Sequence, residues 1–179
     1  MKKTLLTLIA LVSVALGASA MSLKDAYKAL SNIPNVSVVK PDYNLPMDLP
    51  FEQNSGFSIE EGNLAAAYNL NTQQIFETGT ATLTILNQVP LANMINGGNN
   101  NEVGAFVYAE PTGENSNDVL IVAMSGYRGS VVDLYLRNVP DAVCESLQSA
   151  PLEMVDSSLS LKAKLANGDE FNINLNKGR

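Results

Sequence analysis

A break in the most regularly patterned stretch of the sequence brings a serine and an arginine close together. In VLIVAMSGYRGSVVDLYL the apolar run stops at SGYRG, which begins with Ser125 and contains Arg128, and then resumes. A serine nucleophile needs a partner base, most often histidine, and the chain contains no histidine. A short link bracketed by glycines is typical of a hairpin between two strands. We therefore predict a chain reversal here rather than a catalytic loop.

Ser37 and Lys40 match the S-x-x-K spacing of serine acyl-transferases, in which a lysine serves as the base. In those enzymes the serine opens a helix, so that the lysine lies one turn away. Here the intervening residues are β-branched and Pro41 follows, which disfavours helical geometry at Lys40. In a strand, residues three apart point to opposite faces. A small hydrolase using this pair, or using carboxylates, is our second hypothesis.

The acidic residues offer two further chemistries. Two carboxylates flanking a cleft can hydrolyse a glycoside, but no spacing in the sequence brings two together, and we expect most of them on the solvated surface. The oxygen-rich segments 96–101 and 114–118 could supply calcium ligands, yet neither has the twelve-residue spacing of a calcium loop. We predict no metal site and no cofactor. The carboxylates considered are Glu60, Glu61, Asp133, Glu145, Glu153, Asp169 and Glu170.

The single cysteine, Cys144, cannot form an internal disulfide. No histidine or cation stands beside it to lower the pKa of its thiol, so we expect a small, buried and unreactive side chain. The catalytic residues are therefore predicted to be none, and the candidate contact residues are Tyr127, Arg128 and Arg137.

The first twenty residues, MKKTLLTLIALVSVALGASA, have the form of a secretory signal peptide. A charged start is followed by an apolar core and by Ala18-Ser19-Ala20, which predicts cleavage before Met21. The apolar core is too short for a membrane span. We expect a bacterial protein that is exported to the periplasm or the extracellular space, with no membrane span in the mature chain.

Charge narrows the range of partners. Without Lys2 and Lys3, nine of the eleven basic residues remain against eighteen acidic ones, a net charge of −9. Such a surface repels phosphate backbones, so nucleic acid is excluded as a partner. The partner is expected to be an unknown protein or a small ligand.

The elements that must position these residues follow from local patterns. We expect helices over 22–31 and 58–68 and after Pro140, with Ser22 and Asp25 capping the first. We expect a short helical turn over 90–95 and an irregular proline-rich loop over 41–56, while 96–101 is predicted to be a loop. Strands are predicted over 36–39, 80–86, 103–109, 118–124, 130–136, 159–165 and 170–175, the last two joined by a turn at Asn167-Gly168.

Consecutive hairpins with helices between them indicate an α+β fold. We predict an antiparallel sheet built from hairpins, two or three short helices, and a single domain over residues 21–179 after the signal peptide 1–20.

The segments SNIPNVSVVKP and DVLIVAMSGYRGSVVDLYLRNVP resemble exported Bacteroidetes proteins classed as domain of unknown function 4252. Those proteins have a strand entry of the form GV-SV-(I/V)-K and a hairpin rich in valine and leucine with a central glycine. The resemblance implies an exported α+β domain and brings no catalytic residues.

Together these observations favour a non-enzymatic binding or interaction domain. A third hypothesis is an envelope assembly subunit that joins its neighbours by strand addition through residues 159–179.

Overall fold

The computed structural model describes residues 20–39, 63–100, 103–126, 129–149, 152–155, 160–164 and 170–174. Within these ranges the chain forms three α-helices, one 3-10 helix and nine strands. In chain order they are α2 (Leu23–Ser31), β1 (Ser37–Val39), β2 (Asn63–Ala67), α3 (Thr72–Leu86), the 3-10 helix η1 (Leu91–Asn93), β3 (Met94–Asn100), β4 (Val103–Gly113), β5 (Ser116–Ser125), β6 (Ser130–Val139), α4 (Asp141–Ser149), β7 (Leu152–Val155), β8 (Ser160–Lys164) and β9 (Glu170–Asn174).

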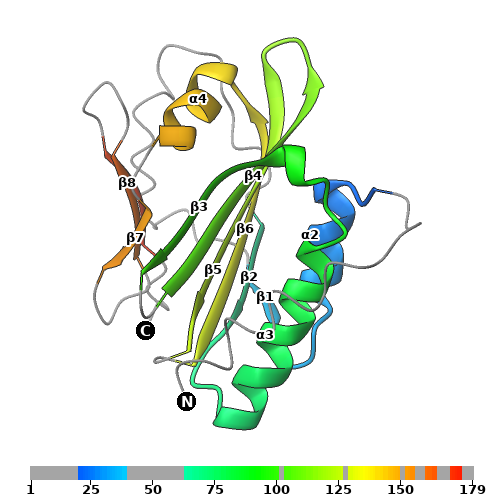
Figure 1. Ribbon diagram of the computed structural model, residues 1–179, viewed down its shortest axis with the longest axis vertical. Helices are drawn as coiled ribbons and strands as arrows, with labels where there is room; N and C mark the ends of the chain where they lie inside the picture. Colours follow the sequence, from blue (N-terminus) through cyan, green and yellow to red (C-terminus); the bar gives the residue numbers. More distant parts are fainter. Residues whose placement is uncertain are drawn as a thin grey trace.

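The strands form two antiparallel sheets. The larger has the order β1-β2-β6-β5-β4-β3, and the smaller has the order β7-β8-β9. Figure 1 shows α2 and α3 on one side of the six-stranded sheet, with α4 and the smaller sheet on the other side. This arrangement confirms the predicted α+β fold with an antiparallel sheet built largely from hairpins.

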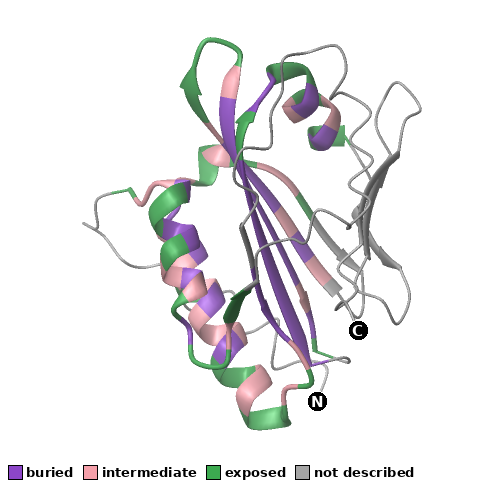
Figure 2. Ribbon diagram, turned by 180° about the vertical axis from the view of Figure 1, so that it is seen from behind, coloured by how far each residue is buried: buried purple, intermediate pink, exposed green. Residues whose placement is uncertain are grey.

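The two central strands of the larger sheet, β5 and β6, are buried on both faces, as the purple strands in Figure 2 show. Their sequences are therefore nearly continuous apolar runs rather than alternating ones. On the side of α2 and α3, the core includes Leu23, Leu30, Leu120 and Val122. We call the contact layer between these two helices and the sheet the helix–sheet interface.

Helix α2 begins as the sequence predicts. The Ser22 hydroxyl accepts a hydrogen bond from the Asp25 backbone N–H at 3.1 Å, which satisfies one free amide of the first turn. Leu23, Tyr27 and Leu30 then form one buried stripe. The cap fixes where the helix starts, and the stripe fixes which side faces the sheet.

The SGYRG segment is a hairpin link, as predicted, because Ser125 pairs with Ser130 in the register of β5 and β6. Gly129 has a φ of +56°, a conformation that side-chain-bearing residues rarely adopt. A Cβ at this position would lie 2.5 Å from the Leu70 carbonyl oxygen. The Leu70 N–H also donates to the Gly129 carbonyl at 3.0 Å, so the turn is fastened to the segment that leads into α3.

The strand predicted over 80–86 is wrong, because this segment is the second half of α3. Its alternation of threonine with apolar residues imitates a strand. However, Thr78, Thr82 and Leu86 are buried at a spacing of four residues, which is one face of a helix. A capping box starts the helix: Asn71 accepts from the Gln74 backbone, and the Gln74 side chain accepts from the Asn71 backbone. Tertiary packing and this cap override the local propensity.

Two further predictions are wrong near the sheet edges. The segment 63–67, predicted as part of a helix, is β2, because Ala65, Ala66 and Ala67 are buried between β1 and β6. The polar segment 96–101, predicted as a loop, belongs to β3 as far as Asn100, where it pairs along β4 as an edge strand. In both places backbone pairing with a neighbouring strand outweighs composition.

The other elements agree with expectation. The short turn at 91–93, the strands β1, β4, β5 and β6, and the helix after Pro140 are all present. Strands β8 and β9 pair as the predicted C-terminal hairpin, while β7 was not predicted. Residues 1–19 of the predicted signal peptide 1–20, the predicted 41–56 loop and the predicted Asn167-Gly168 turn lie outside the described residues. None of the described helices combines the length and the apolar character needed to cross a membrane.

Candidate functional site

Asp133 lies in the middle of the six-stranded sheet, on β6 between β2 and β5. Its partners in the register are Ala65 and Val122, and the same line continues to Phe106 on β4 and Gly97 on β3. We call these five residues the Asp133 row. Directly opposed residues share one face of a sheet, and Ala65 and Val122 belong to the core packed beneath α2. The Asp133 row therefore faces the helices.

The Asp133 side chain is fully buried, and neither of its carboxyl oxygens has a hydrogen-bond partner among the described residues. Because burial disfavours the charged form, it raises the pKa of Asp133 to about 7. The carboxyl group is neutral in acid and changes its charge near neutral pH. Strongly perturbed groups of this kind are typical of functional sites.

Two tyrosines lie beside Asp133 in the helix–sheet interface. Tyr27 of α2 and Tyr135 of β6 stack with their ring centroids 5.3 Å apart and their planes at 17°. The Tyr27 hydroxyl is buried without a partner among the described residues. Burial, and then the charge of Asp133, raises the pKa of Tyr27 to about 12, so its hydroxyl keeps its proton at physiological pH.

The Tyr135 hydroxyl, unlike that of Tyr27, has a hydrogen-bond partner among the described residues. It donates a short hydrogen bond to Oδ2 of Asp118 on β5. Burial first, and this hydrogen bond second, raise the pKa of Tyr135. Asp118 and Asp133 are thus two carboxyl groups with little or no exposure on neighbouring strands. Asp118 has a hydroxyl donor, and Asp133 has none among the described residues.

Helix α3 contributes two more unpaired oxygens. The hydroxyls of Thr78 and Thr82 are buried without a partner among the described residues, on the face of α3 that packs against α2 and β6. A threonine hydroxyl within a helix can bond a carbonyl of the preceding turn, as exposed Thr84 does here with Thr80 at 2.8 Å. Such unpaired buried groups are uncommon in proteins and call for an explanation.

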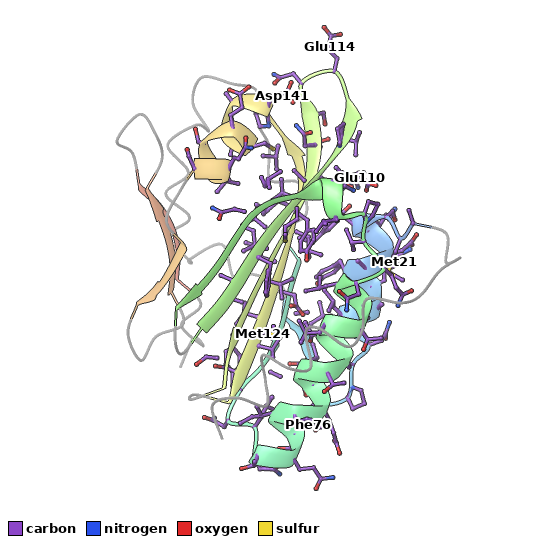
Figure 3. The ribbon with its side chains drawn as sticks, viewed as in Figure 1. Met21, Phe76, Glu110, Glu114, Met124 and Asp141 are labelled. Atoms are coloured by element: carbon purple, nitrogen blue, oxygen red, sulfur yellow. The ribbon has the colours of Figure 1, made fainter. Side chains whose placement is uncertain are left out.

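Burial decreases along the Asp133 row toward the edge of the sheet. Val122 is completely buried, Phe106 is half-buried and Gly97 is exposed. Met124, which is diagonal to Phe106 across the β4–β5 pair, is also half-buried. In Figure 3, Met124 lies on the strands beside the ribbon of α3. The helix layer therefore covers β6 more completely than it covers β4 and β3.

Of the three predicted contact residues, the structure describes Arg137 alone. Tyr127 and Arg128 lie outside the described residues. Arg137 is exposed and lies four residues beyond Asp133 on β6, about 13 Å along the strand. Its positive charge acts on Tyr135, whose pKa it lowers against the larger effect of burial.

The residues of the other catalytic hypotheses are also separated. The Ser37 hydroxyl, on the edge strand β1, donates to the Ala66 carbonyl at 3.4 Å, while Lys40 is not among the described residues. Cys144 is half-buried on α4. Burial, and then the charges of Asp141 and Glu145, raise the pKa of its thiol to about 11, so the thiol is unactivated, as predicted.

The expectation of a solvated carboxylate is wrong for Asp133, although Glu145 is exposed as expected. The overlooked signal is its position in VVDLYL, where one acidic residue interrupts a run of apolar residues. A strand buried on both faces leaves no solvated position for that residue. Within the described part of the chain, no group of three residues of the types that bind metals comes together.

The geometry of the helix–sheet interface is thus the main guide to function. No protein-family model matches the chain, and comparisons with curated proteins and with solved structures give no match either.

Proposed function

We propose that the protein is an exported, non-enzymatic binding domain that holds a small ligand at the helix–sheet interface. One observation carries this proposal: a fully buried carboxyl group at the centre of the main sheet has no partner among the described residues. An unpaired buried charge is costly in free energy. Departures from good core chemistry are expected at functional sites, where binding compensates for them.

The cluster favours binding over catalysis for a chemical reason. A catalytic acid or base needs a reacting group within hydrogen-bond reach. Asp133, Tyr27, Thr78 and Thr82 provide oxygens that can anchor a ligand, and the part of the chain that the structure describes places no activated nucleophile beside them. The thiol of Cys144 is held protonated and belongs to α4, in the layer across the sheet.

Methyl-resolved NMR during a screen of small soluble fragments tests where ligands bind. We expect binding fragments to shift the methyl signals of Ala65 and Val122, which flank Asp133. The matched control is Ile121, which neighbours Val122 on β5 but points to the opposite face. Fragments that shift only Ile121 or surface methyl groups, or a screen without any shift at Val122, would contradict the proposal.

Export is the second part of the proposal, and it rests on the first twenty residues. Expression of the full chain in a bacterium, followed by intact-mass measurement of the secreted or periplasmic protein, is expected to give a chain that begins at Met21. Retention of the full-length chain in the cytoplasm would contradict export while leaving the binding proposal intact.

A further inference from the structure

The unpaired atoms at the helix–sheet interface are all oxygens. They are the two carboxyl oxygens of Asp133 and the hydroxyls of Tyr27, Thr78 and Thr82. Each can accept hydrogen bonds, and only the hydroxyls, or a protonated carboxyl, can donate. A ligand that satisfies this set must therefore supply mainly hydrogen-bond donors.

The charged residues around Asp133 indicate that the ligand is a cation. From α2, the titratable group that faces Asp133 is Tyr27; Lys24, Asp25 and Lys28 of the same helix are exposed. The only acidic or basic residue of α3 is Glu77, which is exposed, and the neighbouring positions on β2 and β5 are Ala65 and Val122. No basic side chain among the described residues is buried beside the carboxylate. A bound cation would neutralise it.

The composition of the site favours an organic cation over a metal ion. Calcium takes six to eight oxygen ligands, usually with several carboxylates, and Asp133 contributes only one. Aromatic rings, in contrast, attract organic ammonium groups through their π-electrons. The stacked rings of Tyr27 and Tyr135 are part of the same core as the Asp133 row.

We propose that the helix–sheet interface binds an organic ammonium ion, with Asp133 as its counter-ion and Tyr27 and Tyr135 beside it. This inference rests on the proposed binding function and specifies its ligand class. The apolar part of the ligand lies along Val122 toward half-buried Phe106. From β6 to β4 is two strand spacings, about 10 Å, which suits a primary amine with a linear apolar chain of about six to eight carbons.

Helix α3 provides the route of entry. Between Thr78 and Thr84 its sequence is TGTATLT, in which every residue other than alanine and leucine is a weak helix former. This part of α3 is therefore held by packing rather than by intrinsic propensity, so its local opening costs less free energy than that of the sheet. Displacement of α3 uncovers the Asp133 row, beginning at half-buried Phe106.

The test uses three probes of equal length and different charge: hexylamine, 1-hexanol and hexanoate. Calorimetry and methyl NMR at pH 8 are expected to show that hexylamine binds wild-type protein at least about tenfold more tightly than 1-hexanol, because only the amine pairs with the carboxylate. Hexanoate is expected not to bind, since it would be repelled. Methylammonium, which lacks the chain, is expected to bind more weakly than hexylamine.

Two variants locate the charge. Asp133→Asn keeps the shape and is expected to abolish the preference for hexylamine over 1-hexanol. The matched control, Glu77→Gln, also removes one negative charge from the helix–sheet region but on the exposed side of α3, and it is expected to preserve that preference. Gly79→Ala is expected to stabilise α3, because the site has room for a methyl group and alanine favours a helix more than glycine does. A more stable α3 opens less often, so hexylamine is expected to associate more slowly.

The outcomes separate the two proposals. If fragments shift the Val122 methyl signal but hexylamine binds no better than 1-hexanol, the ammonium inference fails and the binding function stands. An unchanged preference for the amine in Asp133→Asn also overturns the inference. If no probe and no fragment perturbs Val122, both proposals fail together.

Discussion

The two faces of the six-stranded sheet differ at two neighbouring positions of β6, where one face has an aspartate and the other a leucine. On one face, the Asp133 row places a carboxyl group between Ala65 and Val122. On the other face, the next row places Leu134 beside Ile121, with Val107 beyond them on β4. All of these side chains except Ala65 lie on β4, β5 or β6, and all are buried.

Burial alone does not explain the composition of the helix-facing side of the sheet. The Leu134 row itself is wholly apolar and close-packed, as a stable core requires, although the Ser130 hydroxyl, at the start of β6 on the same face, is also buried without a partner among the described residues. The Asp133 row carries an unpaired carboxyl and lies opposite helices whose buried hydroxyls are also unpaired. Among the described residues, the helix–sheet interface thus gathers four residues with unpaired buried oxygens, whereas the opposite face carries one such hydroxyl at the start of β6.

The largest expected effect comes from the charge of Asp133. The pKa of Asp133 is about 7 in the folded protein and about 3.9 when unfolded, so the unfolded chain releases this proton first as the pH rises. As far as Asp133 is concerned, the unfolding free energy is therefore highest below about pH 4. It falls by about 4 kcal/mol in total as the pH rises through 7.

Urea denaturation of wild type and Asp133→Asn at pH 4, 6 and 8 measures this effect. The difference in unfolding free energy between the two proteins is expected to shift in favour of the variant as the pH rises. Asp118→Asn is the matched control, because the Asp118 carboxyl already accepts from the Tyr135 hydroxyl. If the difference in unfolding free energy between wild type and Asp133→Asn does not vary with pH, the folded protein does not raise the pKa of Asp133.

The next effect concerns the attachment between the helix layer and the sheet. Gly129→Ala forces a Cβ toward the Leu70 carbonyl at a positive φ and is expected to cost about 2 kcal/mol. In the same turn, Gly126→Ala has nothing within 4 Å and is expected to be nearly neutral. Thermal unfolding of both variants checks this contrast, and equal effects would argue against the tight turn.

A pair of isosteric changes compares the two faces directly. Val132→Thr adds a hydroxyl to the apolar face of β6 and is expected to destabilise by about 1 to 2 kcal/mol. Thr82→Val removes an unpaired hydroxyl from α3 and is expected to be neutral or stabilising by up to about 1 kcal/mol. Chemical denaturation measures both. If Thr82→Val destabilises as much as Val132→Thr, the Thr82 hydroxyl has a structural partner and leaves the proposed site.

The smallest effect lies at the start of α3. Asn71→Ala removes the acceptor for the Gln74 N–H and is expected to cost about 1 kcal/mol. Asn71→Ser or Asn71→Asp, which can replace the cap, is expected to recover most of the loss. Equal losses in Ala, Ser and Asp variants would show that the cap does not set the helix start.

The sequence was sufficient where local chemistry and tertiary packing agree. The Ser22 cap, the β5–β6 hairpin and the β8–β9 pairing follow from motifs that act within a few residues. Prediction failed where distant contacts decide. TATLTIL, residues 80–86, alternates like a strand, but the Thr78–Thr82 spacing of a helix face matters only once a sheet and α2 lie beside it.

The candidate site was missed for the same reason. Asp133 is buried because both faces of β6 are covered by other elements. The sequence VVDLYL does not reveal this covering by itself. Arg137, chosen from the sequence, is exposed on the same strand. An acidic residue within an otherwise apolar run is the one sequence feature that could have directed attention to this position.

The most direct measurement is a carbon-13 NMR titration of the Asp133 carboxyl group, with and without hexylamine. We expect a midpoint near 7 in the free protein that moves to lower pH when the amine binds, because the cation favours the charged form. A midpoint near 4 that hexylamine leaves unchanged would contradict both the buried, unpaired carboxyl group and its role as a counter-ion.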